Sequence, residues 1–279
     1  MKILCCLNAD VVSNVALNLL LPTFARHDVC VGLSTRIGGV SQESTEPQAR
    51  RELRVAEQRF ANDVMFPLIE RAAYPDDGRY LTFDEIDRHR AIQVRSLPDP
   101  NTGSGLTFVQ TFAPDVVVSI RYGAIFKGAA IAVPKLGILN LHAGLLPEYR
   151  GVIASFRALM ADEREIGCTL HYITDATIDT GPVVARARVP VVRERSLFWH
   201  VLSLYPPGIA LLIDALGRLA AAETLDARTQ SGGTYFSYPR ADEWEEFLRR
   251  GWRVADPEDL RELFSRYLPG QQQSALTGP

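Results

Sequence analysis

The chain has 279 residues, of which 47% are hydrophobic, 23% charged and 9% aromatic, and its formal net charge is −3. This composition is that of an ordinary globular protein; it excludes disordered, collagen-like and fibrous classes and gives no general attraction for polyanions. Four scattered cysteines form neither a disulfide framework nor a C-x-x-C zinc motif, and the N-terminus lacks a signal-peptide pattern. The apolar stretch 209–222 is too short to span a bilayer. We therefore expect a cytoplasmic protein without a bound metal.

The first 35 residues have the pattern of a β-α-β unit. Apolar runs predict strands at 2–7 and 27–33, with a helix between them at 15–21 that ends at Pro22. The charge-dense segment 41–59 favours helix, and 66–73 continues it. Residues 74–105 are rich in Pro, Asp and Gly, which indicates loops around a short strand at 91–94.

The following residues alternate between strand and helix patterns. Strands are expected at 116–120, 137–141, 169–173 and 183–192, and helices at 152–160 and 197–222. Because of Pro190, the last of these strands is expected at the sheet edge. The alternation predicts an α/β fold with a doubly wound, mostly parallel sheet, whose site lies at the carboxyl ends of the strands.

The character of the sequence changes after residue 222. We expect a catalytic domain at 1–222, a small C-terminal subdomain at 223–268 with helices near 242–250 and 257–268, and a disordered tail at 269–279.

One segment combines side chains that suit acyl transfer. Asn140 and His142 are two positions apart, so they project from the same face of a strand near its carboxyl end, whereas Leu139 and Leu141 point into the core. Asp179 follows a later strand on a loop bounded by Gly and Pro. An amide N–H can hold the oxyanion of a tetrahedral intermediate, an imidazole can move a proton, and a carboxylate can orient that imidazole.

Each of these residues also has an ordinary structural explanation. A single strand histidine is commonly just hydrogen-bonded, an asparagine can bridge a loop, and an aspartate can form a turn. Their joint occurrence favours a catalytic site. His171 lies on a strand whose facing side the sequence leaves open, and a structural role is favoured for it. Cys168 is expected to be a small core residue.

The segment resembles the 10-formyltetrahydrofolate-dependent formyltransferase family, which includes the glycinamide ribonucleotide, methionyl-tRNA, sugar and siderophore enzymes. The resemblance extends over about 1–215 and is strong over 113–184. It is carried by N-x-H at 140–142, L-L-P-x-Y-x-G at 145–151, D-x-G at 179–181, L-H-Y-I-T-D at 170–175 and Y-G at 122–123.

The resemblance implies an N-formyltransferase whose donor is 10-formyltetrahydrofolate. Asn140 and His142 would polarise the formyl carbonyl, and Asp179 would pair with His142 and help move the acceptor's proton to the leaving folate nitrogen. The pterin would lie against two segments. These are Tyr122, Gly123, Ala124, Ile125 and Phe126 in the first, and Ile173, Thr174 and Asp175 in the second.

The charge of the C-terminal residues and the composition of the first loop limit the class of acceptor. Residues 223–279 contain seven arginines and ten acidic residues, and they are fewer than the tRNA enzymes' C-terminal domain would need, so no nucleic-acid partner is expected. Residues 8–14 hold no glycine, which disfavours the phosphate of glycinamide ribonucleotide.

A small amine or hydroxylamine acceptor remains, and N5-hydroxyornithine in siderophore synthesis is favoured over an amino sugar nucleotide. Asp10, with Asn8 beside it, could attract a cationic acceptor. Arg121 could instead bind a carboxylate or phosphate, or form a salt bridge with an acid. The segment 41–105 is expected to shape the acceptor cleft.

Other classes of function fit less well. A nicotinamide oxidoreductase is disfavoured because the first turn lacks G-x-G-x-x-G. A formyltetrahydrofolate hydrolase would use the same three residues and stays open from sequence. A folate-binding module without catalysis is the most distant alternative.

Overall fold

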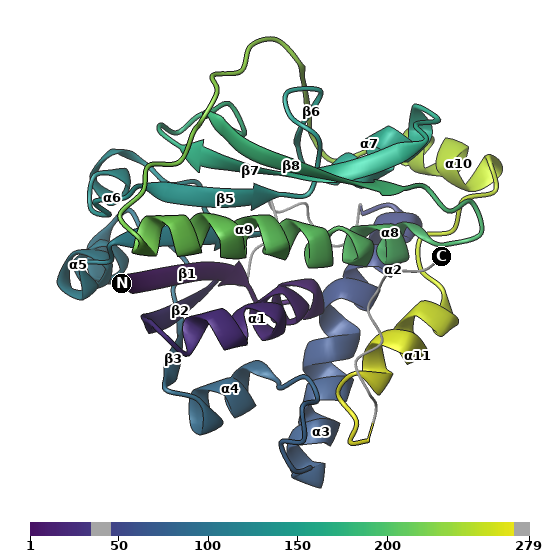
Figure 1. Cartoon of the computed structure of the whole chain (residues 1–279). Coiled ribbons are helices and arrows are strands. Elements are labelled where there is room, and N and C mark those ends of the chain that lie inside the picture. Colours follow the sequence, from purple (N-terminus) through teal and green to yellow (C-terminus); the bar gives the residue numbers. More distant parts are fainter. Residues whose placement is uncertain (35–45, 271–279) are drawn as a thin grey trace.

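The computed structural model describes residues 1–34 and 46–270 (Figure 1). A seven-stranded sheet has the order β3-β2-β1-β4-β5-β7-β8. Its strands are β1 (Lys2–Asn8), β2 (Asp28–Ser34), β3 (Ile92–Ser96), β4 (Val116–Ile120), β5 (Ile138–His142), β7 (Glu165–Ile173) and β8 (Val183–Pro190). The five strands from β3 to β5 in this order are parallel, whereas β5–β7 and β7–β8 are antiparallel pairs. The doubly wound, mostly parallel sheet is therefore confirmed, with β8 at an edge.

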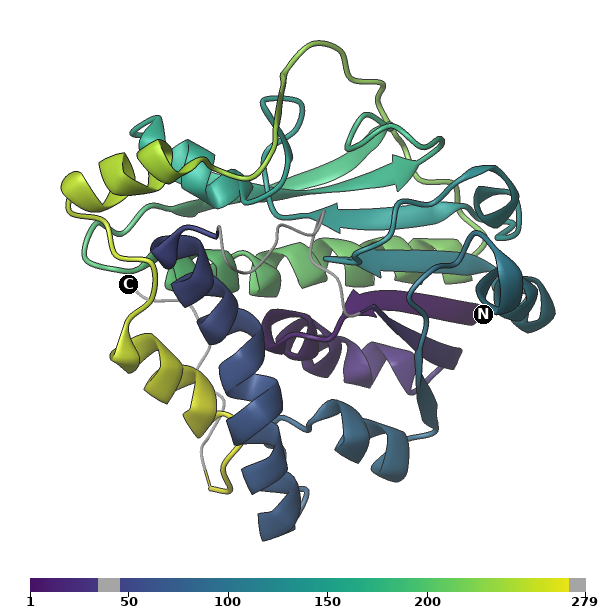
Figure 2. The same cartoon turned by 180° about the vertical axis from the view of Figure 1, so that it is seen from behind.

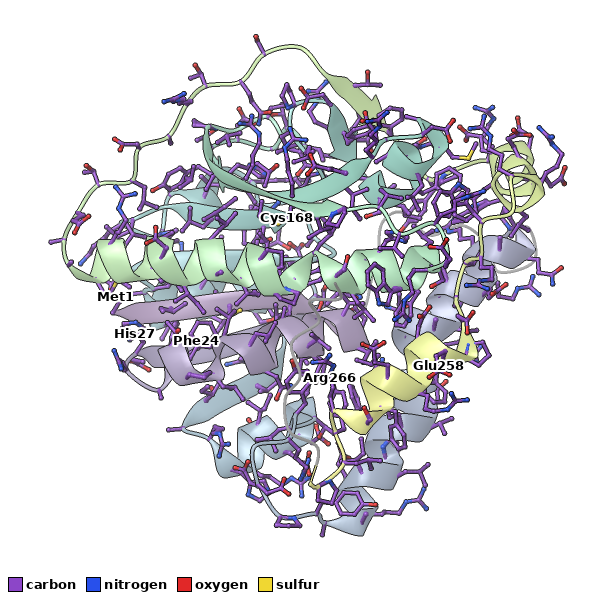
Figure 3. All side chains as sticks on the ribbon, turned by 45° about the vertical axis from the view of Figure 1, so that its right-hand side comes forward. Met1, Phe24, His27, Cys168, Glu258 and Arg266 are labelled. Atoms are coloured by element: carbon purple, nitrogen blue, oxygen red, sulfur yellow. The ribbon has the colours of Figure 1, made fainter. Side chains whose placement is uncertain are left out.

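Both faces of the sheet are covered, which explains the continuous apolar runs of its central strands. In β1, Ile3, Cys5 and Leu7 belong to the large core cluster, whereas Leu4 and Cys6 belong to a smaller one on the opposite face. Two helices pack over the large cluster, α1 (Val11–Phe24) and α9 (Tyr205–Ala220). The smaller cluster is covered by α5 (Gly103–Phe112) and α6 (Gly128–Ile131) (Figure 2). The labelled Cys168 lies on β7, beside α9 (Figure 3).

Several helices differ from the sequence prediction. Helix α1 begins at Val11 because Asp10 caps it by accepting the Ser13 N–H, and Pro22 lies inside its last turn instead of ending it. The 74–105 region also contains α4 (Phe83–His89), whose capping box joins Thr82 and Glu85, and the start of α5.

The helical segment after β2 is a continuous run with an unusual centre. It consists of α2 (Gln48–Arg54), the π-helical turns η2 (Val55–Arg59) and η3 (Ala61–Met65), and α3 (Phe66–Ala72). The part of the predicted helix at 41–45 lies outside the described residues. The π-helical turns widen the helix, and such turns are frequent at functional sites.

The described part of the chain after α9 forms one further strand and two further helices. Its strand β9 (Thr234–Phe236) pairs with β6 (Tyr149–Gly151), next to α7 (Ala154–Met160). Helices α10 (Ala241–Arg249) and α11 (Pro257–Ser265) then add Trp244, Phe247 and Leu263 to the large core cluster. Figure 3 labels Glu258 and Arg266 at the two ends of α11. The domain division at residue 222 stays a prediction, and only 269 and 270 of the expected tail are described.

One helical stretch lies within the helix that the sequence analysis expected at 197–222. Helix α8 (Leu197–Ser203) and α9 form a 24-residue stretch, Leu197–Ala220, that could cross a membrane by length and composition alone. The sequence analysis judged only the apolar part at 209–222 too short to span a bilayer, and the whole helical stretch is longer than that part. In the structure, 67% of its most apolar window is buried inside the fold, which is the environment of a core helix.

Candidate active site

The site begins at the carboxyl end of β5. Asn140 and His142 project from one face of this strand, and Leu139 and Leu141 between and beside them are buried in the core, as predicted. His142 is 8% exposed, and its Nε2 donates to the Tyr149 carbonyl oxygen at 2.7 Å. Its other ring nitrogen, Nδ1, faces Asp179 Oδ2 at 3.4 Å. The ring therefore has a fixed orientation and a carboxylate ready to support a second proton.

The Asp179 carboxylate contacts both histidines and the backbone of a second loop. Its Oδ2 also accepts the Gly151 backbone N–H at 2.9 Å, and its Oδ1 lies 3.4 Å from His171 Nε2. The residue has a left-handed backbone with φ 57°, a conformation that costs a non-glycine residue about 1–2 kcal/mol. Gly181 allows the loop to turn back, because a Cβ there would lie 1.8 Å from the Tyr172 carbonyl oxygen.

His171 contacts two of the predicted site residues, Asn140 and Asp179, and the structural role that the sequence analysis favoured for it stays a prediction. It is 1% exposed and pairs directly with Asn140 across the antiparallel β5–β7 ladder, at a β-bulge between β7 and β8. Its Nδ1 donates to the Tyr172 carbonyl oxygen at 2.9 Å, and its Nε2 lies 3.0 Å from Asn140 Nδ2 as well as 3.4 Å from Asp179 Oδ1. The contact with Asn140 fixes the amide and leaves its second N–H for another acceptor.

The environment keeps Asp179 ionised. Burial alone would raise the pKa of this carboxyl, but the nearby His142 and His171 rings and the Gly151 N–H lower it to about 2. Across the neutral range the carboxylate can therefore hold an imidazolium in place without taking its proton.

The four cysteines contribute no nucleophile to the site. All are buried, and burial raises the pKa of the Cys168 thiol to about 12. Cys168 is 1% exposed in the large core cluster, which confirms its predicted core position. Within 1–34 and 46–270, no three His, Cys, Asp or Glu side chains are grouped as a metal site requires.

The two segments expected against a pterin border the same small core. Tyr122 and Ile173 both pack on the cluster that α5 and α6 cover, and the Tyr122 and Phe126 rings lie 5.4 Å apart. Ile125 on the first segment is 47% exposed. Gly123 donates its backbone N–H to Ser34 Oγ at 2.9 Å, and Thr174 and Asp175 are exposed. An exposed aliphatic side chain on a segment that also carries two neighbouring aromatic rings fits one face of a planar heterocycle.

The three residues expected at the acceptor form part of a buried network. Asn8 and Asp10 are 0% exposed. Asn8 Nδ2 donates to Asp10 Oδ2 at 2.9 Å, and Arg121 Nε donates to the same oxygen at 3.0 Å. Neither Asn8 nor Asp10 has surface for a ligand, so their expected direct contact with an acceptor is replaced by a role in holding Arg121.

Sequence reasoning missed the fourth member, Glu57. Its Oε2 accepts from Arg121 Nη2 at 2.8 Å, and it is carried by the π-helical turn η2. Burial raises the pKa of Glu57, with Arg121 acting against it. Arg121 has a left-handed φ of 55° and comes directly after Ile120, which pairs with Leu141 next to His142. Two carboxylates around one guanidinium thus lie beside the catalytic strand.

Comparison with known proteins bears on the family resemblance and on the fold. Residues 90–198, which include β4, β5, β7 and the Asn140, His142 and Asp179 positions, match the family model described as formyl transferase. The sequence resemblance to this family is thereby supported over residues 90–198.

Individual relatives agree with the family match. Methionyl-tRNA formyltransferase of Thermus thermophilus is 37% identical over 172 residues, which are 59% of this chain and 54% of that protein. The chain spans about half the length of the curated relatives it matches.

Two solved structures share the fold. Glycinamide ribonucleotide transformylase 1 of Symbiobacterium toebii has a TM-score of 0.55 and 18% identity, covering 83% of this chain and 94% of that one. The Helicobacter canadensis N-formyltransferase, in complex with folinic acid and dTDP-3-aminofucose, has a TM-score of 0.50 and 20% identity, covering 85% and 71%. The α/β formyltransferase fold is therefore established for this chain.

Proposed function

We propose that this protein transfers a formyl group from 10-formyltetrahydrofolate to an amine or hydroxylamine nitrogen of a small molecule. The observation that carries the proposal is the geometry around Asp179, whose two carboxylate oxygens lie 3.4 Å from His142 Nδ1 and from His171 Nε2. The formyl transferase match over 90–198 supports the reaction class. The folate donor is supported by the apolar surface beside Tyr122 and by the folinic acid bound in the Helicobacter protein.

When bound, the folate supplies an activated formyl carbon. The acceptor nitrogen forms a bond to that carbon, the bond to N10 breaks, and the acceptor's proton passes to N10. Asn140 offers one Nδ2 N–H to the developing oxyanion while its other is held by His171. His142 moves the proton, and Asp179 supports the ring in its cationic form. The pKa of Asp179 is about 2, so its carboxylate stays charged.

The network around Arg121 favours an acceptor without a negative charge at this position. Asp10 and Glu57 both bind the guanidinium, so its positive charge is already paired within the chain. A phosphate would therefore find no unpaired positive charge at Arg121, whereas an ammonium group needs none. This supports N5-hydroxyornithine, in siderophore synthesis in the cytoplasm, as the favoured acceptor, with an amino sugar nucleotide as the alternative.

A tRNA acceptor is the second candidate because the curated relatives have that activity in their names. Against it, residues 223–279 contain ten acidic residues and seven arginines, which would repel a phosphate backbone. The charge of the C-terminal part therefore favours the small-molecule acceptor.

An acceptor screen tests the proposal. The full chain is incubated with 10-formyltetrahydrofolate and, separately, N5-hydroxyornithine, a dTDP-amino sugar, glycinamide ribonucleotide or methionyl-tRNA, and formylated product is measured by mass. The proposal predicts product with hydroxyornithine and none with Asn140→Ala. Product only with a sugar nucleotide, ribonucleotide or tRNA would overturn the favoured acceptor. Free formate released without any acceptor would identify a hydrolase instead.

A further inference from the structure

The chain that follows α9 is bound to both loops of the active site. We call residues 224–238 the strap; it arches from α9 over the β7–β8 side of the sheet and descends beside β6 towards α10 (Figure 1). At its start, Arg228 and Val183 exchange two backbone hydrogen bonds of 2.8 Å. At its end, Phe236 accepts the Val152 N–H at 3.0 Å in the β6–β9 pair. Between these points lie the loop that carries Asp179 and the loop that carries Gly151.

Gln230, in the middle of the strap, binds the Asp179 loop through its side-chain amide. Its Nε2 donates to the carbonyl oxygen of Asp179 at 3.0 Å and to that of Gly181 at 2.7 Å. The two carbonyls flank the turn that gives Asp179 its left-handed φ of 57°. The two N–H groups of the amide therefore hold the backbone at Asp179, whose side chain lies between the two histidines, and at Gly181 two residues further on.

The other end of the strap holds the partner loop. Gly151, whose N–H binds Asp179 Oδ2, packs so closely under the strap that a Cβ there would lie 2.1 Å from the Phe236 carbonyl oxygen. Arg150 Nη2 donates to the Gly233 carbonyl oxygen at 3.3 Å. One continuous segment thus fixes the backbone of Asp179 from one side and its Gly151 donor from the other.

We propose that Gln230 is a positioning residue for the reaction, which acts by holding the Asp179 backbone so that the carboxylate lies between His142 and His171. This deepens the proposed formyl transfer and rests on it for its catalytic consequence. The positional consequence is independent of the reaction. Without these two hydrogen bonds, the left-handed backbone of Asp179 would relax towards the ordinary right-handed or extended region. This change would move the carboxylate away from the two rings.

A further feature of Gln230 fits this role. Its Oε1 is buried and has no hydrogen-bond partner among the described residues, a situation that costs free energy for a polar atom. An apolar side chain would avoid that cost at this half-buried position, so the two donated hydrogen bonds are what the amide contributes.

The test compares Gln230→Ala and Gln230→Met with Thr229→Ala in the full chain. Gln230→Met keeps the length of the side chain but has no donor. Thr229 is the neighbouring strap residue with an exposed side chain, so its variant is the matched control. The readouts are amide hydrogen exchange of residues 178–181, NMR titration of the Asp179 carboxyl, and kcat and KM for transfer.

The proposal predicts that exchange at 178–181 becomes at least tenfold faster in both Gln230 variants, with β7 and β8 unchanged. The pKa of Asp179 rises from about 2 towards the ordinary value. Turnover falls roughly ten- to a hundredfold while KM for the folate donor stays the same, as expected for misplacement of a catalytic group. Thr229→Ala should match the wild type.

Unchanged exchange and an unchanged Asp179 titration in Gln230→Met would overturn the positioning role, whatever the activity. If the wild type transfers no formyl group at all, the proposed reaction fails, but the exchange and titration results still decide whether Gln230 positions Asp179. If Gln230→Ala is unfolded, the same readouts on Gln230→Met decide the question.

Discussion

Replacing Asp179 by asparagine removes the negative charge that lies 3.4 Å from each of two imidazole nitrogens. Its pKa of about 2, against an ordinary value of 3.8, corresponds to about 2.5 kcal/mol of stabilisation of the folded chain when the carboxylate is charged. Because folding lowers this pKa, the stabilisation is present above about pH 4 and is lost as the pH falls towards 2. The substitution should remove it at every pH.

Urea unfolding of wild type and Asp179→Asn at several pH values measures this pH-dependent stabilisation. We expect the difference in free energy of unfolding to be about 2 kcal/mol larger near pH 6 than at pH 2, where the carboxyl of the folded chain is still half ionised. About half of the full stabilisation of about 2.5 kcal/mol should remain at pH 3. Turnover should fall by roughly 10⁴, the loss seen when the carboxylate that orients a catalytic histidine is neutralised. A difference in unfolding free energy that does not change with pH would refute the electrostatic reasoning, and unchanged turnover would refute the catalytic role.

Three further substitutions test separate parts of the site. Asn140→Ala should lower kcat by roughly 10²–10³, the usual loss of one oxyanion donor, and near-normal turnover would remove it from the mechanism. Glu57→Gln should raise KM for a cationic acceptor about tenfold without changing KM for the folate donor, and an unchanged acceptor KM would contradict the charge argument at Arg121. Gly151→Ala should destabilise the chain by about 1–3 kcal/mol in urea unfolding, because its φ is 100° and a Cβ would meet the Phe236 carbonyl oxygen; an unchanged midpoint would contradict the close approach of the strap.

The strand that carries the site was predictable because its physics is local. Alternation along β5 places Asn140 and His142 on one face and the two leucines in the core, and no distant residue is needed to see it. Helix α4 was missed although its Thr82–Glu85 capping box is present in the sequence, because the prolines and glycines around it indicated loops.

The partners of these residues depend on distant parts of the chain. His171 faces Asn140 only because β7 runs antiparallel to β5, and the pattern of strands and helices gave no sign of that reversal. Glu57 reaches Arg121 from a π-helical turn, which a 3.6-residue period does not describe. Gln230 lies on a segment without periodicity, 51 residues from Asp179, so no sequence pattern joins them.

The central claim is that this site moves a formyl group from folate nitrogen to an acceptor nitrogen. The most direct measurement follows 10-formyltetrahydrofolate labelled with ¹³C in the formyl group, in the presence of N5-hydroxyornithine and the full chain. The account predicts that the label appears in a formylated hydroxylamine in the same amount as tetrahydrofolate is formed, and that Asp179→Asn slows both equally. Label that stays on folate with every acceptor in the screen, or that leaves only as formate, would contradict it.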